Sequence, residues 1–306
     1  MTPTATPWTH VFHNAQRHWV GDGFPVRTVF SYGNAGRVLS PFLMLDHAGP
    51  TTFNPTTAQR GVGEHPHRGF ETVTIVFDGE VTHQDSAGGG GTIGPGEVQW
   101  MTAGAGVVYA EFHSRAYAQR GGAFEMIQLW VNLPAKLKMT APSNKALTRD
   151  SIRQGRLDCQ PTLDSSPDLA PTAQLNVYAG TLAGFKGPAL THSPIVLASL
   201  RIPADSLLTL PKPTGHVQAA LLMRGQLHAE NTLPVETGDV LVWPENADQI
   251  TLHTTQDTLL LWLGGEPILE PIAGYGPFVM NTQAEIHQAV LDFRAGRMGQ
   301  LTPTSL

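Results

Sequence analysis

Short apolar runs that alternate with glycine- and proline-containing turns constrain this chain more than any other feature of its sequence. Runs bounded by turn signals are typical of strands, and their regular recurrence favours a β-sandwich or barrel. The 32 glycines and 24 prolines supply the turns that such a fold needs. We therefore expect an all-β protein with strands at 72–77, 107–112, 125–133, 174–182, 195–202, 217–230, 239–244, 249–254 and 258–265.

The segment at 141–172 is polar, is rich in Pro, Ser and Asp, and has no clear periodicity. We interpret it as a linker between an N-terminal β domain at 1–140 and a C-terminal one at 173–306. Near the end, Thr282 and Glu285 form a capping box, which predicts a helix over 283–296. We expect this helix to dock and to complete the C-terminal domain, because apolar residues recur at helical spacing at Ile286, Ala289, Val290 and Phe293.

The charge and the cysteine count exclude several classes of function. The formal net charge is −6, so the chain lacks the basic footprint of a protein that grips nucleic acid directly. The single cysteine, Cys159, excludes an intrachain disulfide framework and fits a reducing compartment. The first residues lack the features of a secretory signal, and no apolar run is long enough to span a membrane. We expect a cytoplasmic protein without a membrane partner.

Two histidines in the stretch GEHPHRGFET, residues 63–72, are the first candidates for chemistry. Alternation along an extended backbone places His65 and His67 on one face. Pro66 cannot donate a ladder hydrogen bond, which favours an edge strand or a strand start. Imidazole is a ligand for Fe, Cu, Ni and Zn, so the pair is either a metal clamp or a coincidence of spacing.

The stretch VVYAEFHS carries a second set of candidates, because alternation places Tyr109, Glu111 and His113 on a common face. If this strand faces His65 and His67, Glu111 completes two histidines and one carboxylate. That donor set leaves positions open for a substrate and dioxygen in non-haem iron oxygenases. The alternative is that Glu111 is an exposed carboxylate in a salt bridge. The glycine-rich stretch at 86–96 lacks the end of a phosphate-binding loop, so we interpret it as a hairpin connection.

Several long motifs in order resemble the pirin family, a bicupin group within the cupin superfamily. They lie at 40–50, 63–112, 127–134 and 265–299, and the resemblance covers most of the chain. It implies two tandem cupin domains, each a jelly-roll β-barrel, with one mononuclear metal ion in the first. The metal is most often iron, with Zn, Ni, Cu and Mn as alternatives.

The same resemblance implies the ligands, which are the two histidines of an H-P-H motif and the histidine and glutamate of an H-x-E motif. His65, His67 and Glu111 match these positions, whereas Tyr109 stands where the family has a histidine. Three outcomes stay open: Tyr109 ligates as a phenolate, water fills its place, or metal binding is lost. His113 could replace it only if the strand is bulged.

Other residues of the first half are given supporting roles. Glu71 is expected near the ligands, where it would orient a histidine. His47 and His83 are interpreted as structural, and Trp100 and Met101 as pocket wall or core. We expect a second half without an H-x-H pair or an H-x-E motif and interpret His216 and His228 as isolated, so we expect a second barrel without metal.

Three functions follow from the resemblance. The first is a quercetin 2,3-dioxygenase, which opens a small aromatic, flavonol-like substrate with O2 and uses Glu111 as the base for the hydroxyl proton. The second is a metal-dependent redox-sensing regulator that binds a protein partner without turnover. The third is a degenerate scaffold without metal. We expect a monomer, because two domains already cover each other.

Overall fold

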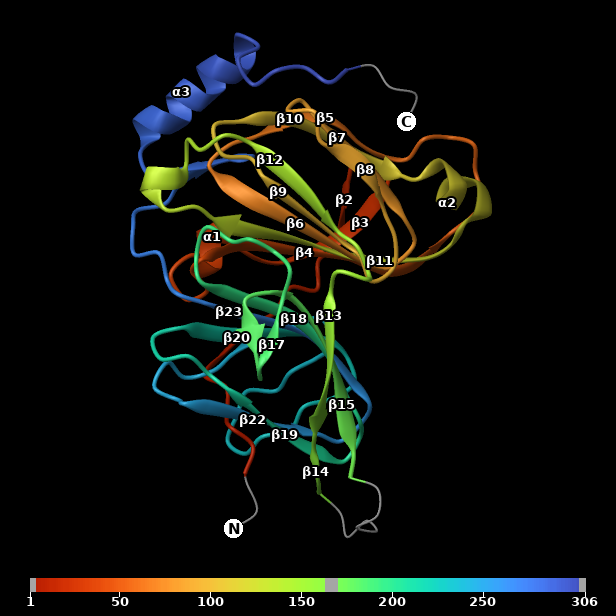
Figure 1. Cartoon of the computed structure of the whole chain (residues 1–306), viewed down its shortest axis with the longest axis vertical. Helices are drawn as coiled ribbons and strands as arrows, with labels where there is room; N and C mark the ends of the chain where they lie inside the picture. The colour runs from red at the N-terminus through yellow and green to blue at the C-terminus, as the bar shows by residue number, and fades with distance from the viewer. Residues whose placement is uncertain (1–3, 163–169, 303–306) are drawn as a thin grey trace. The chain divides into compact units, whose positions relative to one another are not determined.

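The computed structural model describes residues 4–162 and 170–302, and its strand ladders are antiparallel (Figure 1). The chain forms two compact units, and neither is one continuous stretch. The first unit consists of Ala15–Arg37, Pro41–Arg149 and Ile268–Leu306, and the second of Met1–Asn14, Val38–Ser40 and Asp150–Pro267. The all-β class is confirmed.

Among the described residues, the first unit contains two large sheets and a hairpin. The seven-stranded sheet has the order β12 (Ser143–Leu147), β9 (Val98–Thr102), β6 (Phe70–Asp78), β11 (Gly122–Asn132), β4 (Phe42–Phe53), β3 (Phe24–Ser31), β2 (His18–Val20). The four-stranded sheet has the order β5 (Gly61–His67), β10 (Val107–His113), β7 (Val81–Asp85), β8 (Gly90–Ile93). The hairpin joins β24 (Ala273–Tyr275) and β25 (Phe278–Met280).

The second unit repeats this plan with a smaller second sheet. Its seven-stranded sheet has the order β1 (His10–Phe12), β21 (Val240–Val242), β20 (Val217–Arg224), β23 (Thr258–Gly265), β18 (Ile195–Ile202), β15 (Thr172–Ala179), β13 (Arg153–Asp158). The described part of the unit also has a three-stranded sheet of β14 (Gln160–Pro161), β19 (Ser206–Pro211) and β22 (Gln249–Thr254). A hairpin joins β16 (Thr181–Leu182) and β17 (Phe185–Lys186).

Helices are few and short in the described residues: α1 (Tyr32–Ala35), α2 (Arg115–Arg120), a 3-10 turn η1 (Ala135–Leu137), and α3 (Gln283–Arg294). The capping box predicted for α3 is present, since Thr282 accepts a hydrogen bond from the Glu285 backbone and the Glu285 side chain accepts one from Thr282. Ile286 and Ala289 are buried on one face of α3, as the spacing predicts, whereas Phe293 is 38% exposed.

The predicted boundaries differ from the structure in two ways. The supposed linker at 141–172 contains strands β12, β13 and β14, of which β12 pairs with β9 in the first unit and β13 with β15 in the second. These strands are mostly exposed, so their sequences lack the apolar alternation that marks a half-buried strand. The predicted C-terminal helix packs on β24 and β25, within the first unit rather than at the end of the second.

The two interiors differ in polarity. In the second unit, one cluster of buried apolar residues fills the space between the sheets and includes Trp8, Trp243 and Trp262. In the first unit the buried apolar residues form separate clusters, one around Phe124 and another around Met101 and Tyr109. The interior of the first unit also contains buried polar side chains, among them Thr74, Gln99 and Glu111.

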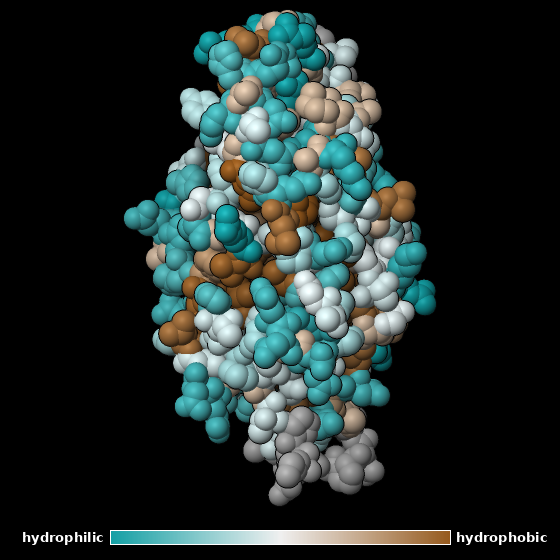
Figure 2. All heavy atoms as spheres, turned by 90° about the vertical axis from the view of Figure 1, so that its left-hand side faces the viewer, coloured by the Kyte–Doolittle hydropathy of each residue, from teal (hydrophilic) through white to brown (hydrophobic). Residues whose placement is uncertain are grey.

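On the face shown in Figure 2, hydrophilic side chains predominate and hydrophobic ones gather in patches between them. Among the described residues, no helix is both long enough and apolar enough to cross a membrane.

Candidate metal centre

Strands β5 and β10 of the first unit carry the predicted ligands, with His65 and His67 on β5 and Tyr109 and Glu111 on β10. Tyr109 lies directly opposite His65, and Val107 lies opposite His67, so these side chains share the inner face of the four-stranded sheet. The ring centroids of His65 and His67 are 4.8 Å apart, and that of Tyr109 lies 5.5 and 5.9 Å from them. The prediction that β5 is an edge strand is confirmed, since it ends this sheet.

The register between the two strands shifts between Tyr109 and Glu111, which lies opposite Val62. The shift leaves an extra residue on β5, the hallmark of a β-bulge, next to the predicted ligands. On its other side, β10 pairs with β7, where His83 lies directly opposite Glu111. Glu111 and His83 are 4% and 2% exposed, so both face the interior of the unit.

The facing sheet contributes a row of polar side chains that the sequence interpretation missed. Asp46, Gln128, Thr74 and Gln99 lie directly opposite one another on the adjacent strands β4, β11, β6 and β9. All but Gln128 are buried, and Gln128 bonds to two other polar groups of the site. A signal was available at Thr74, Gln99 and Gln128, because each of them stands between two apolar residues of its strand, whereas Asp46 is followed by His47.

One hydrogen-bonded network links this row to the opposite sheet. The Tyr109 hydroxyl lies 3.0 Å from Glu111 Oε2 and 2.9 Å from Gln99 Oε1. The Gln128 amide donates to Glu111 Oε1 at 3.4 Å, and Thr74 Oγ1 donates to Gln128 Oε1 at 3.2 Å. Because a phenol has one proton, it serves one of its two acceptors at a time, and an ionised carboxylate is the stronger acceptor.

Burial dominates the electrostatics of this network. Desolvation raises the pKa of Glu111 to about 7, although the hydrogen bonds from Tyr109 and Gln128 oppose the shift. The pKa of Tyr109 is raised well above 10, first by burial and then by the Glu111 charge. Tyr109 is therefore a neutral phenol at neutral pH in the metal-free protein, and the phenolate outcome would need an ion to supply the acidity.

The hydrogen bonds of the two histidine rings indicate which ring nitrogens are free to bind an ion. His65 Nδ1 lies 2.8 Å from the Gly63 carbonyl oxygen, which can only accept, so the proton is on Nδ1 and the lone pair on Nε2. A backbone carbonyl that holds the second nitrogen is the usual support for a metal-bound histidine. The pKa of His67 is lowered well below 6.5 by burial, and its Nδ1 has no hydrogen-bond partner among the described residues.

Two neutral imidazoles, a carboxylate and a phenol fit a transition-metal ion in their donor chemistry. They are not yet arranged around one point, because the residues 4–162 and 170–302 contain no group of three His, Cys, Asp or Glu placed to hold an ion. The hydrogen bonds from Tyr109 and Gln128 occupy the Glu111 carboxylate. Metal binding would therefore require side chains to rotate within the site.

Two stacked aromatic rings border the histidines. Trp130 and Phe70 stack with centroids 4.2 Å apart, and the Trp130 ring meets that of His67 edge to face at 5.6 Å. Trp130 lies two residues after Gln128 on β11, and it is half-buried. The site thus has a flat aromatic wall beside one predicted ligand.

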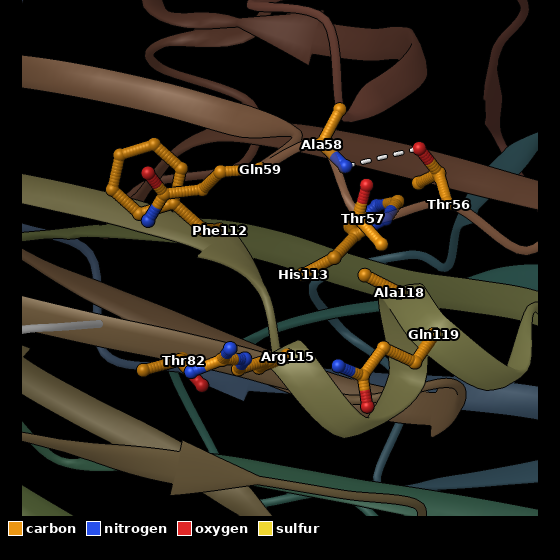
Figure 3. Close-up of a pocket in the computed structure, with 10 residues that line it drawn as sticks. All are labelled: Thr56, Thr57, Ala58, Gln59, Thr82, Phe112, His113, Arg115, Ala118 and Gln119. Atoms are coloured by element: carbon orange, nitrogen blue, oxygen red, sulfur yellow. Dashed lines mark hydrogen bonds between the residues drawn. The ribbon is translucent and has the colours of Figure 1, made fainter.

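His113 is held away from this site in spite of the bulge. Its Nε2 donates to the Gly23 carbonyl at 2.9 Å, and its ring packs between those of Phe53 and Phe124, at 4.6 and 4.8 Å. The ring also lines a separate pocket of about 230 Å³, between the loop of residues 56–59 and helix α2 (Figure 3). In that view Arg115 and Gln119 lie across the pocket from the loop, where the Ala58 amide donates to Thr56.

Other predicted residues occupy defined places. Glu71 Oε1 accepts hydrogen bonds from Trp100 at 3.1 Å and Thr102 at 2.7 Å, so it braces β9, and its orientation of a histidine stays a prediction. His47 Nε2 lies 2.9 Å from Glu125 Oε1, and both side chains are fully buried.

The expectations that the second half lacks an H-x-E motif and that His228 is isolated were wrong. Residues 228–230 read His-Ala-Glu, and the His228 ring lies 5.5 Å from that of His253. The pair lines a pocket of about 470 Å³ in the second unit. The contact was hidden because the two histidines are 25 positions apart in the chain. They meet where Leu227 bridges Thr254, and there the His228 amide donates to the His253 carbonyl at 2.9 Å.

Comparisons with known proteins match both halves of the chain. A family model described as Pirin matches residues 23–131, and one described as Pirin C-terminal cupin domain matches residues 197–299. A Pseudomonas aeruginosa protein named as a candidate quercetin 2,3-dioxygenase is 48% identical over 287 residues, which are 94% of this chain and 96% of that protein.

Solved structures give the same result for the fold. The crystal structure of a quercetin 2,3-dioxygenase from Acinetobacter baumannii matches with a TM-score of 0.88 at 45% identity, covering 98% of this chain and all of that one. A bacterial pirin from Escherichia coli in complex with nickel(II) matches with a TM-score of 0.59 at 19% identity, covering 85% and 99% of the two chains, a likeness that shows the shared fold. The predicted pair of cupin-type domains is confirmed.

Proposed function

The chain belongs to the pirin family, and from that premise we propose that its first unit binds one transition-metal ion, with iron as the expected metal, and opens a flavonol-type aromatic ring with dioxygen. His65, His67 and Glu111 would hold the ion, with the Tyr109 phenol beside it. When bound, such an ion supplies the Lewis-acid and one-electron chemistry that ring opening with dioxygen requires. Named relatives support the reaction class.

The observation that carries this proposal is the buried Glu111 carboxylate, which is hydrogen-bonded to Gln128 of the polar row and to Tyr109, whose ring lies beside both imidazoles. A flavonol hydroxyl must lose its proton before the ring becomes electron-rich enough to react, and the proposal assigns Glu111 as the base that accepts it. Gln128 and Gln99 offer amide groups to the oxygen atoms of such a substrate. The stacked Trp130 and Phe70 rings offer a flat apolar surface to its aromatic part.

The test has two stages. Metal analysis of the purified protein should find about one ion per chain, and aerobic incubation with quercetin should bleach the flavonol absorbance. Glu111→Gln keeps the shape of the side chain but removes the base and the charged ligand, so bleaching should fall at least 100-fold. Glu64→Gln, an exposed carboxylate on the same strand as His65, is the matched control. Full activity in Glu111→Gln would contradict the assigned role.

A second candidate function is favoured by the hydrogen bonds that already occupy Glu111. A site that holds an ion without exchanging substrate could report oxidation state to a protein partner, and such a role needs no base. A metal-loaded protein that leaves quercetin unchanged in air would favour this second function. A protein that binds no metal would contradict both.

A further inference from the structure

His83, on β7, is a buried imidazole in the site for which the proposed function has no use. Its side chain is 2% exposed, and neither ring nitrogen has a hydrogen-bond partner among the described residues. Buried polar atoms without partners are rare in folded proteins, because each one loses its hydrogen bonds to water without replacement. Two such atoms on one ring indicate a bound group that the described protein residues do not supply.

The chemistry of the ring suits a metal better than a charged partner. Asp85, two residues along β7, does not bond to either nitrogen of the His83 ring. A neutral imidazole presents one nitrogen lone pair, which can bind an ion without first losing a proton. Asp85 itself is engaged by the backbone amides of Ala87 and Gly89 and by Asn144.

The position of His83 is close to that of the missing ligand. It lies opposite Glu111 on the neighbouring strand, and its ring stacks on that of Tyr109 with centroids 6.3 Å apart. On its other side, β8 places Gly91 opposite His83, where a Cβ atom would lie 3.8 Å from Nε2. The ring thus leans toward a residue without a side chain, and no hydrogen bond opposes its rotation toward Glu111.

We propose that His83 supplies the third imidazole of the metal site, in place of the nitrogen donor that is absent at Tyr109. This inference rests on the proposed function, because it requires that the first unit binds a metal. It assigns a ligand set of His65, His67, His83 and Glu111. Tyr109 then acts as a hydrogen-bond donor to the carboxylate rather than as a ligand.

Copper(II) reports the number of nitrogen ligands through the hyperfine splitting in its electron paramagnetic resonance spectrum. The full chain carrying His228→Gln is the parent protein, because the exposed His228 and the half-buried His253 form a pair of rings that would also bind copper. One equivalent of Cu2+ should give the pattern of three nitrogens in the parent and of two after His83→Gln. Copper affinity should fall at least tenfold.

His216→Gln is the matched control, since His216 lies in the second unit and also has a buried Nδ1 without a partner in the described chain. It should leave the spectrum unchanged. In case His83→Gln does not fold, the parent labelled with 15N-histidine should show three ring systems shifted by Zn2+ in a nitrogen-detected NMR spectrum.

The outcomes separate the two proposals. Two imidazoles in the parent, unchanged by His83→Gln, would overturn the role of His83 and leave the proposed function intact. Three imidazoles that persist after His83→Gln would overturn it as well. A parent that binds no ion would overturn both.

Discussion

Lys138 is a buried cation whose replacement tests how the first unit holds the strand that carries the predicted ligands. Its Nζ donates at 2.8 Å to each of three acceptors, the carbonyls of Gly69 and Val279 and Oδ1 of Asn132. Gly69 follows the His67 strand, and Val279 belongs to the hairpin under α3. Burial lowers the pKa of Lys138 from 10.5 to about 8.

The lowered pKa predicts the direction and the size of a pH effect on stability. Between pH 8 and 10.5 the unfolded chain binds more protons at Lys138 than the folded one does, so the free energy of unfolding rises with pH. The full gain is about 3 kcal/mol, since a tenfold change in proton affinity is worth about 1.4 kcal/mol. This gain in unfolding free energy is fully present above 10.5, the pKa of Lys138 in the unfolded chain, and is lost as the pH falls through about 8.

Urea unfolding of the wild type and of Lys138→Met at pH 7 and pH 10 would measure this term. The variant should be less stable at pH 7 by about 2 kcal/mol. Three buried acceptors lose their donor, and this cost exceeds the gain from removing a buried charge. The difference between the two proteins should grow by about 2.5 kcal/mol at pH 10. Lys136→Met, an exposed neighbour, should stay parallel to the wild type. Parallel profiles for Lys138→Met would refute the reasoning.

Three further changes test other parts of the first unit. Tyr109→His restores the family's nitrogen donor, so the number of metal ions per chain after reconstitution should rise; unchanged occupancy would argue against an incomplete site. Gln128→Leu removes an amide donor from the buried Glu111 carboxylate. Urea unfolding of chelator-treated protein at pH 8 should show that the variant has lost about 1–2 kcal/mol of unfolding free energy. An unchanged free energy of unfolding would mean that the network does not stabilise the fold. Arg68 holds the pKa of Asp292 well below its usual range, so Asp292→Asn should cost about 1 kcal/mol at pH 7. This cost should begin to shrink below the usual carboxyl pKa and be lost as the pH falls through the lowered pKa of the folded state, and a constant cost would contradict the ion pair.

Strands with strong apolar runs could be predicted from the sequence almost to the residue. The runs at 195–202, 249–254 and 258–265 coincide with β18, β22 and β23. The run at 217–230 was too long, because β20 ends at Arg224 before Gly225, which has a positive φ of 86°. Strands β12 and β13 were missed for the opposite reason, since an exposed edge strand carries little apolar pattern.

The candidate site was predictable where it depends on alternation within one strand. That rule placed His65, His67, Tyr109 and Glu111 on a shared inner face. It could not place Gln99 or Gln128, because their roles depend on pairing between strands far apart in the chain. The same limit applies to His83, whose lack of a partner is a property of the folded interior.

The contrast between the two units explains why the chemistry is assigned to the first. Both are antiparallel sandwiches, and the second fills its interior with apolar residues such as Leu200, Leu260 and Trp262. The first instead aligns four polar side chains across adjacent strands and buries Glu111 and His83 above them. Such groups cost desolvation free energy that an apolar interior avoids, as the second unit demonstrates with the same architecture. A fold that can be built without this cost is expected to retain it only where the polar groups bind a ligand, and this is our reason for proposing the metal site in the first unit.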